Sequence, residues 1–201
     1  MLTAAAALAL ATACAPGVAP STLLSVAFAE SHWEPLAIHD NLTGGTILPA
    51  SRPEAADIAA RLIAEGHNPD LGLLQINAAN LIRTGLTIQT AFDPCASMRA
   101  GAQILADGYQ GGATTAAQQA ALLRALSAYN TGSPTAGLRT YAPLVLAAAR
   151  RVVPALRVAG LADAPAGASP RAPPPPRSDP FVTEAPDSAS SLSFPVQESK
   201  P

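Results

Sequence analysis

Proline residues are unevenly placed along this 201-residue chain, and their distribution limits how much of it can fold. Eleven of the 20 prolines lie between Pro154 and Pro201, including an unbroken run at residues 173–176. This stretch has little periodic apolar pattern, so it cannot bury enough surface to offset the entropy lost on ordering. We therefore predict a disordered, partly polyproline tail over residues 161–201, either a passive tether or a docking segment. The remainder, about 140–150 residues, has the usual size of one domain.

The composition favours helices and argues against two classes of protein. Hydrophobic residues make up 49% of the chain, but aromatic residues only 4% and charged residues 13%. The apolar residues are mostly Ala and Leu, which are strong helix formers. A coiled coil is excluded, because such chains are about half charged and helix-forming residues at heptad spacing. A nucleic-acid partner is not expected, since 12 Lys and Arg against 14 Asp and Glu give a net charge of −2.

The first thirteen residues form a short apolar run that ends in Ala11-Thr12-Ala13, directly before Cys14. This order is typical of the apolar region and cleavage site of a secretory signal, so we predict a signal peptide over residues 1–13. No Lys or Arg precedes the run, which leaves two alternatives: a first helix of the domain, or a start codon placed too late. No apolar stretch reaches the 18 residues of a membrane-spanning helix.

Capping residues and apolar stripes predict about six helices and one small β-hairpin. The hairpin is predicted within residues 36–48, around Gly44-Gly45, and residues 70–77 are predicted to form a loop. No strand–helix–strand alternation occurs, so the fold class is α+β and mostly α. The predicted helices cover residues 21–35, 51–66, 77–85, 93–108, 115–129 and 141–156. Their predicted N-terminal caps are Ser21-Thr22, Ser51, Asn77, Asp93 and Thr115.

The sequence lacks the motifs of dinucleotide, phosphate and metalloprotease sites, and no Ser stands in a recognisable nucleophile turn. His32, His39 and His67 do not have the i, i+4 spacing of a helical zinc site. We therefore expect neither a metal ion nor a cofactor.

Glu30 is the unusual ionisable residue of the chain. It shares a helical stripe with Leu23 and Ala27, so its side chain is expected to point toward the core. It also lies in the last turn of that predicted helix, where the helix dipole disfavours a negative charge. Burial and the dipole both raise a carboxyl pKa, which suits a general acid near neutral pH. The alternative is a solvated Glu near a helix end.

Three segments stand in the order and spacing of the lysozyme-like lytic transglycosylases. They are Ala29-Glu30-Ser31, Gly-Leu-Leu-Gln-Ile-Asn at residues 72–77, and Ala-Tyr-Asn-Thr-Gly at residues 128–132. The chain most resembles the branch that serves type IV secretion and conjugation systems, because residues 14–20, 93–95 and 101–105 also match it. The resemblance covers about residues 14–142 and implies a lysozyme-like helical domain, which we place at residues 14–160.

The resemblance implies a role for each matching residue. Glu30 is the expected catalytic acid and base. The residues expected to support the site or bind the glycan are Ser31, Leu74, Gln75, Asn77, Tyr129 and Asn130. Tyr129 and Asn130 are expected to close one wall of the cleft and to position Glu30. For Tyr129 the alternative is a core aromatic, and for Gln75 an amide that stabilises its loop.

The resemblance also implies that Cys14 and Cys95 form a disulfide, which supports export to the periplasm. Taken by itself, a separation of 81 residues leaves two buried thiols as an alternative. A lipid-modified Cys14 is a second alternative, although the residues before it lack the usual Leu three positions earlier.

The activity implied by the resemblance is cleavage of the β-1,4 bond between N-acetylmuramic acid and N-acetylglucosamine without water as nucleophile. The implied partners are peptidoglycan glycan strands and, through the proline-rich tail, channel proteins of a type IV secretion system. A hydrolytic muramidase of the goose-lysozyme type is an alternative, and it needs a second carboxylate such as Asp40, Glu54 or Asp70. A non-catalytic peptidoglycan-binding scaffold is another.

Overall fold

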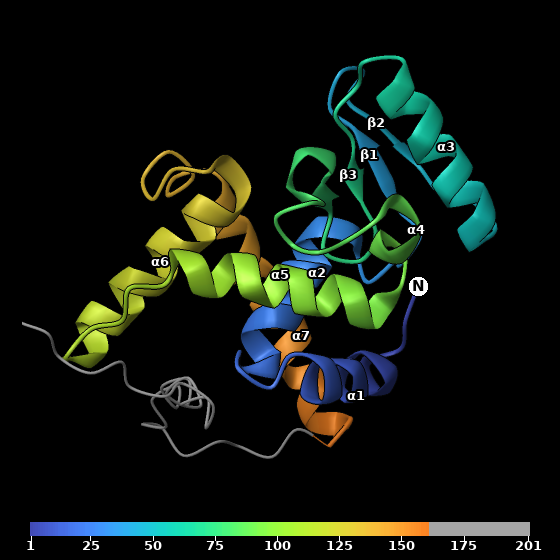
Figure 1. The fold of residues 1–201 in the computed structure, drawn as a ribbon. Coiled ribbons are helices and arrows are strands. Elements are labelled where there is room, and N and C mark those ends of the chain that lie inside the picture. The colour runs from blue at the N-terminus through green and yellow to red at the C-terminus, as the bar shows by residue number, and fades with distance from the viewer. Residues whose placement is uncertain (161–201) are drawn as a thin grey trace, which may run out of the picture. The chain divides into compact units, whose positions relative to one another are not determined.

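The computed structural model describes residues 1–160, and the predicted tail over residues 161–201 lies outside the described residues. The described part is mostly helical and has one small antiparallel sheet, so the predicted α+β class is confirmed (Figure 1). The α-helices are α1 (Ala4–Cys14), α2 (Pro20–Ser31), α3 (Arg52–Ala64), α4 (Ile88–Ala91), α5 (Pro94–Gly108), α6 (Thr115–Thr131) and α7 (Tyr141–Val158). The strands are β1 (Ile38–Asp40), β2 (Gly45–Ile47), β3 (Asp70–Leu71) and β4 (Ile76–Asn77), and a 3₁₀ turn, η1, spans Ala78–Asn80.

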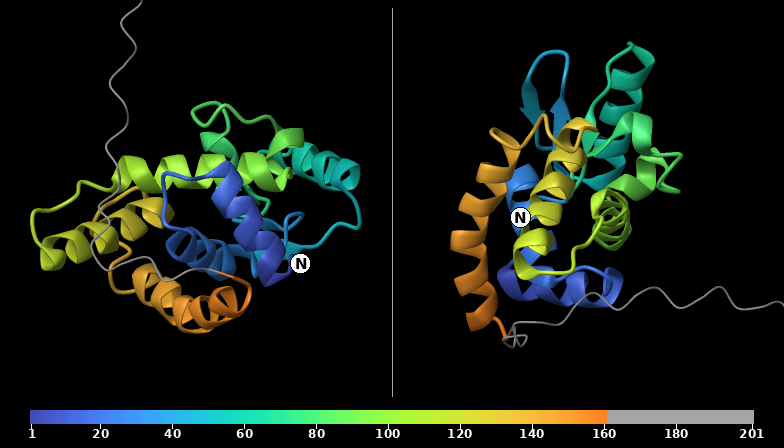
Figure 2. Two further views of the ribbon diagram at one scale, coloured as in Figure 1. Left: turned by 90° about the horizontal axis from the view of Figure 1, so that it is seen from below. Right: turned by 90° about the vertical axis from the view of Figure 1, so that its left-hand side faces the viewer.

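Helix α2 lies in the middle of the helical bundle. Figure 2 shows it between α5 and α7, and it packs on both as well as on α1. Leu23, Leu24, Val26 and Ala27 of α2 are fully buried. At about 25 cal/mol per Å² of apolar surface, such side chains supply most of the stabilisation of the bundle. The C-terminal turn of this buried helix carries Glu30, which is therefore held on a rigid element.

The sheet begins with the predicted hairpin, in which β1 pairs antiparallel with β2. The Asp40 carboxylate closes its turn by accepting hydrogen bonds from the Leu42 amide and the Thr43 hydroxyl, and it also contacts His67 Nδ1 at 3.0 Å. The Thr43 hydroxyl is the main reason why the pKa of Asp40 is lowered. Asp40 therefore stabilises this turn, and both of its carboxylate oxygens already have partners.

The prediction of a loop over residues 70–77 was wrong at its two ends. Residues there form β3 and β4, which pair with each other, while β3 also pairs with β1, so the strand order is β2-β1-β3-β4. Two-residue strands are too short to show an alternating pattern. The pairing of β3 with β1 joins segments some thirty residues apart, and a local sequence pattern cannot indicate it.

The starts of α3 and α5 were predicted correctly, because a side chain caps each of these helices. Ser51 caps α3 and Asp93 caps α5, each accepting a backbone N–H three residues on, as predicted. The predicted cap at Ser21-Thr22 was wrong, because α2 begins at Pro20 without a side-chain cap. The predicted cap at Thr115 was wrong by one residue, because the Thr114 hydroxyl accepts from the Ala117 amide.

The helix predicted between residues 77 and 85 is shorter than expected. Asn77 does cap it, but only the single turn η1 forms. Helix α4 was not predicted, although Thr87 and Thr90 make a reciprocal capping box at its start.

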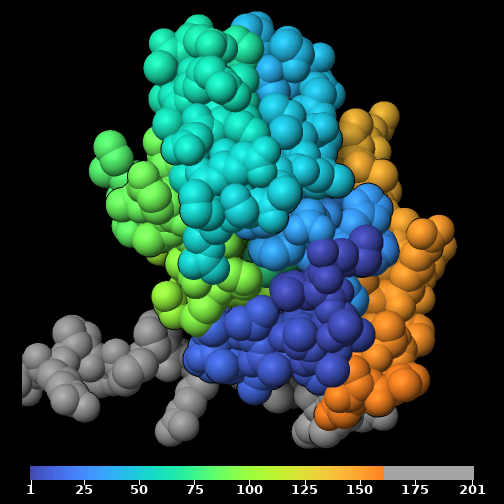
Figure 3. All heavy atoms as spheres, turned by 90° about the vertical axis from the view of Figure 1, so that its right-hand side faces the viewer, coloured from blue at the N-terminus to red at the C-terminus, as the bar shows by residue number. Residues whose placement is uncertain are grey.

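The apolar N-terminal run is a packed helix in this structure. Ala7 and Ala11 of α1 are fully buried, and α1 packs on α2, α5 and α7. In Figure 3 the dark blue α1 lies against the orange α7. This is the arrangement expected if the run is the first helix of the domain. Removal of residues 1–13 would take two fully buried residues out of the core, and cleavage after Ala13 stays a prediction.

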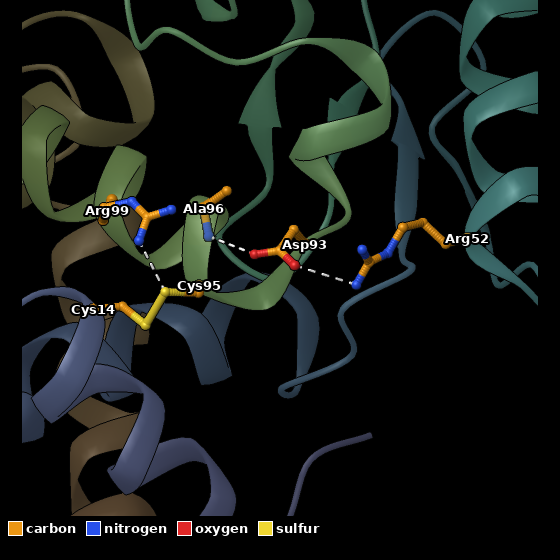
Figure 4. The surroundings of a disulfide bond; sticks show 6 residues. All are labelled: Cys14, Arg52, Asp93, Cys95, Ala96 and Arg99. Carbon is orange, nitrogen blue, oxygen red and sulfur yellow. Dashed lines mark hydrogen bonds and ion pairs between the residues drawn. A yellow bond between two sulfur atoms is a disulfide. The ribbon is translucent and has the colours of Figure 1, made fainter.

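A disulfide joins α1 to α5, as the resemblance implied. Cys14 ends α1 and Cys95 lies in the first turn of α5, with Cα atoms 5.4 Å apart (Figure 4). Arg99 Nη1 lies 3.0 Å from Cys95 Sγ, and Asp93 Oδ2 lies 3.4 Å from Arg52 Nη2 of α3. The disulfide therefore anchors α1 to the first turn of α5. Asp93 caps this turn and forms an ion pair with Arg52 of α3.

Candidate active site

A cleft of about 490 Å³ lies beside the end of α2, bordered by the sheet, the segment after it and α6. Five of the seven predicted site residues line it: Glu30, Gln75, Asn77, Tyr129 and Asn130. They come from three regions that are far apart in the sequence, and the fold brings them to one concave surface. The structure therefore places the residues of all three motifs around one cleft.

Glu30 is a partly buried acid that lines the cleft. Burial is the main cause that raises its pKa from 4.5 to about 7. A hydrogen bond from Tyr141 opposes this shift, and the negative charge of Asp70 adds to it. About half of the Glu30 side chains are consequently protonated near neutral pH, as a general acid requires. The predicted effect of burial is thus confirmed, and the negative charge of Asp70 adds a contribution that was not predicted.

Tyr141 is a site residue that the sequence reasoning missed. It is the first residue of α7, and its hydroxyl donates a hydrogen bond to Glu30 Oε1. Since Oε1 accepts this bond, a proton on Glu30 is carried by Oε2. The sequence indicates only that Tyr141 opens an apolar stripe that continues through Val145 and Val152, and this places Tyr141 on the buried face of α7 without identifying its partner.

Tyr129 contributes to the cleft differently from the prediction. Its hydroxyl donates to the Leu74 carbonyl at 2.7 Å rather than to Glu30. Its ring stacks on that of Tyr141, with centroids 6.4 Å apart and planes 11° apart. Tyr129 therefore positions Glu30 only indirectly, by supporting Tyr141 and fixing the loop that carries Gln75.

Ser31 and Leu74 have buried side chains that do not line the cleft but pack beneath the residues that do. The Ser31 hydroxyl lies 2.7 Å from the Leu73 carbonyl, and it joins the end of α2 to the loop between β3 and β4. Leu74 is fully buried, and a Cβ added to Gly101 of α5 would lie 2.6 Å from its Cγ. The Leu74 side chain fills the space that Gly101 leaves open and does not line the cleft, so a role of Leu74 in glycan binding stays a prediction.

Gln75 both lines the cleft and stabilises its loop. Its amide donates to the Gly72 carbonyl at 2.8 Å and to the Ala37 carbonyl at 3.1 Å. These bonds hold Gln75 in a left-handed backbone conformation with φ of 46°. Gly72 is required nearby, since it has φ of 74° and a Cβ there would lie 2.3 Å from the Ala91 carbonyl oxygen.

The remaining lining is rich in amide side chains. Asn41, Asn68 and Asn80 line the cleft beside the predicted Asn77 and the exposed Asn130. Amides donate and accept hydrogen bonds without carrying a charge, which suits a ligand with many hydroxyl and acetamide groups. Asn41, Asn68 and Asn80 were not predicted, because a single Asn in a loop carries no pattern.

No three His, Cys, Asp or Glu side chains within residues 1–160 are grouped so that they could hold a metal ion. The helices of that same region include none that is long and apolar enough to cross a membrane.

Comparisons with known proteins agree with the site. A family model described as "Transglycosylase SLT domain" matches residues 7–138. "Protein virB1" of Agrobacterium fabrum is 43% identical over 144 residues, which cover 71% of this chain and 59% of that protein. "Type IV secretion system protein virB1" of Brucella suis is 34% identical over 204 residues, which cover 96% of this chain and 76% of that protein.

The chain therefore spans about three fifths of the length of the Agrobacterium relative. No solved structure matches it. The family model covers the three motifs that surround the cleft, from Glu30 to Asn130. The chain belongs to the SLT transglycosylase family and is a homologue of the virB1 proteins of type IV secretion systems.

Proposed function

We propose that the chain cleaves the β-1,4 bond between N-acetylmuramic acid and N-acetylglucosamine in peptidoglycan and leaves a 1,6-anhydro-muramoyl end. The observation that carries this proposal is Glu30, a partly buried acid with a pKa of about 7 in an amide-lined cleft of an SLT-family domain. Transglycosylation requires one group that first donates and then accepts a proton. Glu30 is suited to both steps, because neither of its protonation states is strongly favoured near neutral pH.

Protonated Glu30 begins the reaction by donating the proton on Oε2 to the glycosidic oxygen. The bond from this oxygen to C1 of the muramoyl residue then breaks, and positive charge develops on that sugar. The N-acetyl group of the same sugar stabilises this charge. Tyr141, still donating to Oε1, stabilises the carboxylate that has formed.

The ionised Glu30 completes the reaction as a base. It takes the proton of the muramoyl C6 hydroxyl while that oxygen bonds to C1, which closes the anhydro ring and restores the acid. No water is consumed. This step needs only one carboxylate, in contrast to hydrolysis with two carboxyl groups beside the bond.

A product analysis of wild-type protein tests this proposal. Purified sacculi digested with the protein should give muropeptides that end in anhydro-muramic acid, each lighter by one water than a hydrolytic product. Mass spectrometry and labelling of reducing ends by borohydride distinguish the two. New reducing ends in place of anhydro ends would refute transglycosylation and favour the hydrolytic alternative, for which Asp70 is the second carboxylate in the cleft.

Tyr141→Phe should lower the cleavage rate about tenfold and move the alkaline limb of the pH profile upward. The Tyr141 hydrogen bond favours ionised Glu30, so its loss raises the pKa of Glu30 further and retains the acid form to higher pH. The rate falls because the carboxyl loses its fixed orientation. The measurement is anhydro-product release between pH 5 and 9. Tyr109→Phe, which removes the same atom from a Tyr outside the cleft, should leave the profile unchanged.

We further propose that the protein acts in the periplasm and opens the wall locally for a type IV secretion system. The Cys14–Cys95 disulfide supports an oxidising compartment. The similarity to virB1 proteins supports the secretion system as the setting, and recruitment of channel proteins by residues 161–201 remains part of the proposal.

A further inference from the structure

Arg83 is the only cationic side chain among the residues of the described chain that line the cleft. Apart from the acids Glu30 and Asp70, its polar neighbours in the lining are amides and the Tyr129 hydroxyl, which carry no charge. The sugar rings of a peptidoglycan strand are likewise uncharged, and amides suffice to bind their hydroxyl and acetamide groups. A permanent positive charge in this lining therefore points to an anionic group of the ligand.

The turn that carries Arg83 keeps its shape without help from the Arg83 side chain. The amide and the hydroxyl of Thr84 both donate hydrogen bonds to the Asn80 carbonyl, at 3.0 and 2.9 Å. The Leu86 amide donates to the carbonyl of Leu81 at 2.8 Å, and Leu81 is buried. These bonds present the guanidinium to the cleft from an ordered turn, so its position is set before a ligand arrives.

The guanidinium has a partner, Asp107, but this ion pair leaves most of its donors available. Arg83 Nη1 donates to Asp107 Oδ2 at 3.0 Å, and the two side chains are 49% and 54% exposed. Such exposed pairs stabilise a protein little, because water screens the charges. The contact uses one of the five N–H groups of the guanidinium. Asp107 lies one turn after Ile104 on α5, and Ile104 lines the cleft, so the pair stands at the border of the cleft.

We propose that Arg83 is a specificity-determining residue that binds a carboxylate on the lactyl substituent of the muramoyl sugar. In peptidoglycan this substituent carries the stem peptide with its free carboxylates, and after removal of the peptide it ends in a carboxylate itself. A guanidinium matches either group, because its planar fork can donate two parallel hydrogen bonds. The inference rests on the proposed function, from which it takes the substrate. Strands of N-acetylglucosamine alone have similar rings and acetamides but no carboxylate, so Arg83 distinguishes peptidoglycan from chitin.

The test is a binding measurement in the Glu30→Gln background, in which no ligand is cleaved. The three probes are a GlcNAc–MurNAc tetrasaccharide with its stem peptides, the same tetrasaccharide after an amidase has removed the peptides, and chitotetraose. Arg83→Gln should weaken binding of a carboxylate-bearing tetrasaccharide about tenfold and change that of chitotetraose less than twofold. The tetrasaccharide that loses affinity identifies the source of the carboxylate, the stem peptide or the lactyl group.

Ionic strength gives a second readout, which a merely structural role would not move. Added salt should weaken binding of the carboxylate-bearing ligand when Arg83 is present, and this dependence should be much smaller in Arg83→Gln. Arg61→Gln is the matched control, because Arg61 is an exposed Arg of α3 that does not line the cleft. Asp107→Asn breaks the ion pair and keeps the guanidinium, so it should retain the affinity within about twofold.

Other outcomes overturn the inference. An equal loss of affinity for all three probes would show that Arg83 only supports the cleft wall, and so would a loss in Asp107→Asn as large as that in Arg83→Gln. Unchanged affinity for both carboxylate-bearing probes would show that Arg83 does not contact the ligand, and failure to bind any of the three would also contradict the proposal. The proposed function fails separately, when the wild-type protein gives reducing ends, because binding is measured without cleavage.

Discussion

Replacing Glu30 by Gln should reduce glycan cleavage by about 10³-fold or more while the protein stays folded. Gln has nearly the same shape as Glu and can still accept the hydrogen bond from Tyr141, but it has no proton to donate and cannot accept one as a base. The first step of the proposed reaction loses its acid, and the second step loses its base. The measurement is release of anhydro-muropeptides from purified sacculi, with the circular dichroism of the variant as the check on folding.

The same substitution should stabilise the protein above pH 7. Glu30 has a higher pKa in the folded than in the unfolded chain, so the folded state binds more protons between about pH 4.5 and 7. Wild-type stability contributed by this group is therefore present below that window and is lost as the pH rises through it. Gln carries no charge at any pH, so the variant avoids the free-energy cost of ionising this side chain in the folded protein, about 3 kcal/mol at pH 8.

Glu65→Gln is the matched control, because Glu65 is exposed at the end of α3 and lies outside the cleft. It should change neither the rate nor the pH dependence of thermal unfolding. A Glu30→Gln variant that cleaves sacculi at the wild-type rate would show that Glu30 is not the catalytic acid. An inactive variant whose melting temperature does not rise relative to wild type at pH 8 would contradict the burial of the charge.

The burial effect at Glu30 could be predicted from the sequence because the evidence for it is local. The spacing of Glu30 from Leu23 and Ala27 on one helical stripe places it on the buried side of α2, and the adjacent Ser31 completes the motif. The caps at Ser51 and Asp93 were equally predictable, since each bonds to an amide three residues away. For both caps, the backbone amide that donates the hydrogen bond lies within one turn of the capping side chain.

Tyr141 could not be identified in this way, because its partner Glu30 lies 111 residues earlier in the chain. The contact forms only after α7 packs on α2, and no local pattern encodes which helix faces which. Leu74 shows a second limit. Its place within a motif does not show whether its side chain faces the cleft or the core, and in the structure it is buried in the core.

The disulfide gives the second large effect that we expect. Replacing both Cys14 and Cys95 by Ala should destabilise the protein by about 4 kcal/mol in the chain-entropy model, because the bond closes a long loop in the unfolded chain. For a domain of this size, such a loss lowers the melting temperature by about 10 °C. Thermal unfolding of wild type with and without reductant measures the same difference without substitution.

The effect should be concentrated in α1, which the disulfide ties to α5. The two fully buried residues of α1, Ala7 and Ala11, contribute less per residue than a buried Leu or Phe, and its Leu8 and Leu10 are only partly buried. Hydrogen exchange should therefore show that the amides of α1 lose protection first in the double variant, while those of α5 keep theirs. Reductant should not change the double variant further. A melting temperature within 2 °C of wild type would show that the packing of α1 alone fixes it to the domain, and the 4 kcal/mol estimate would be wrong.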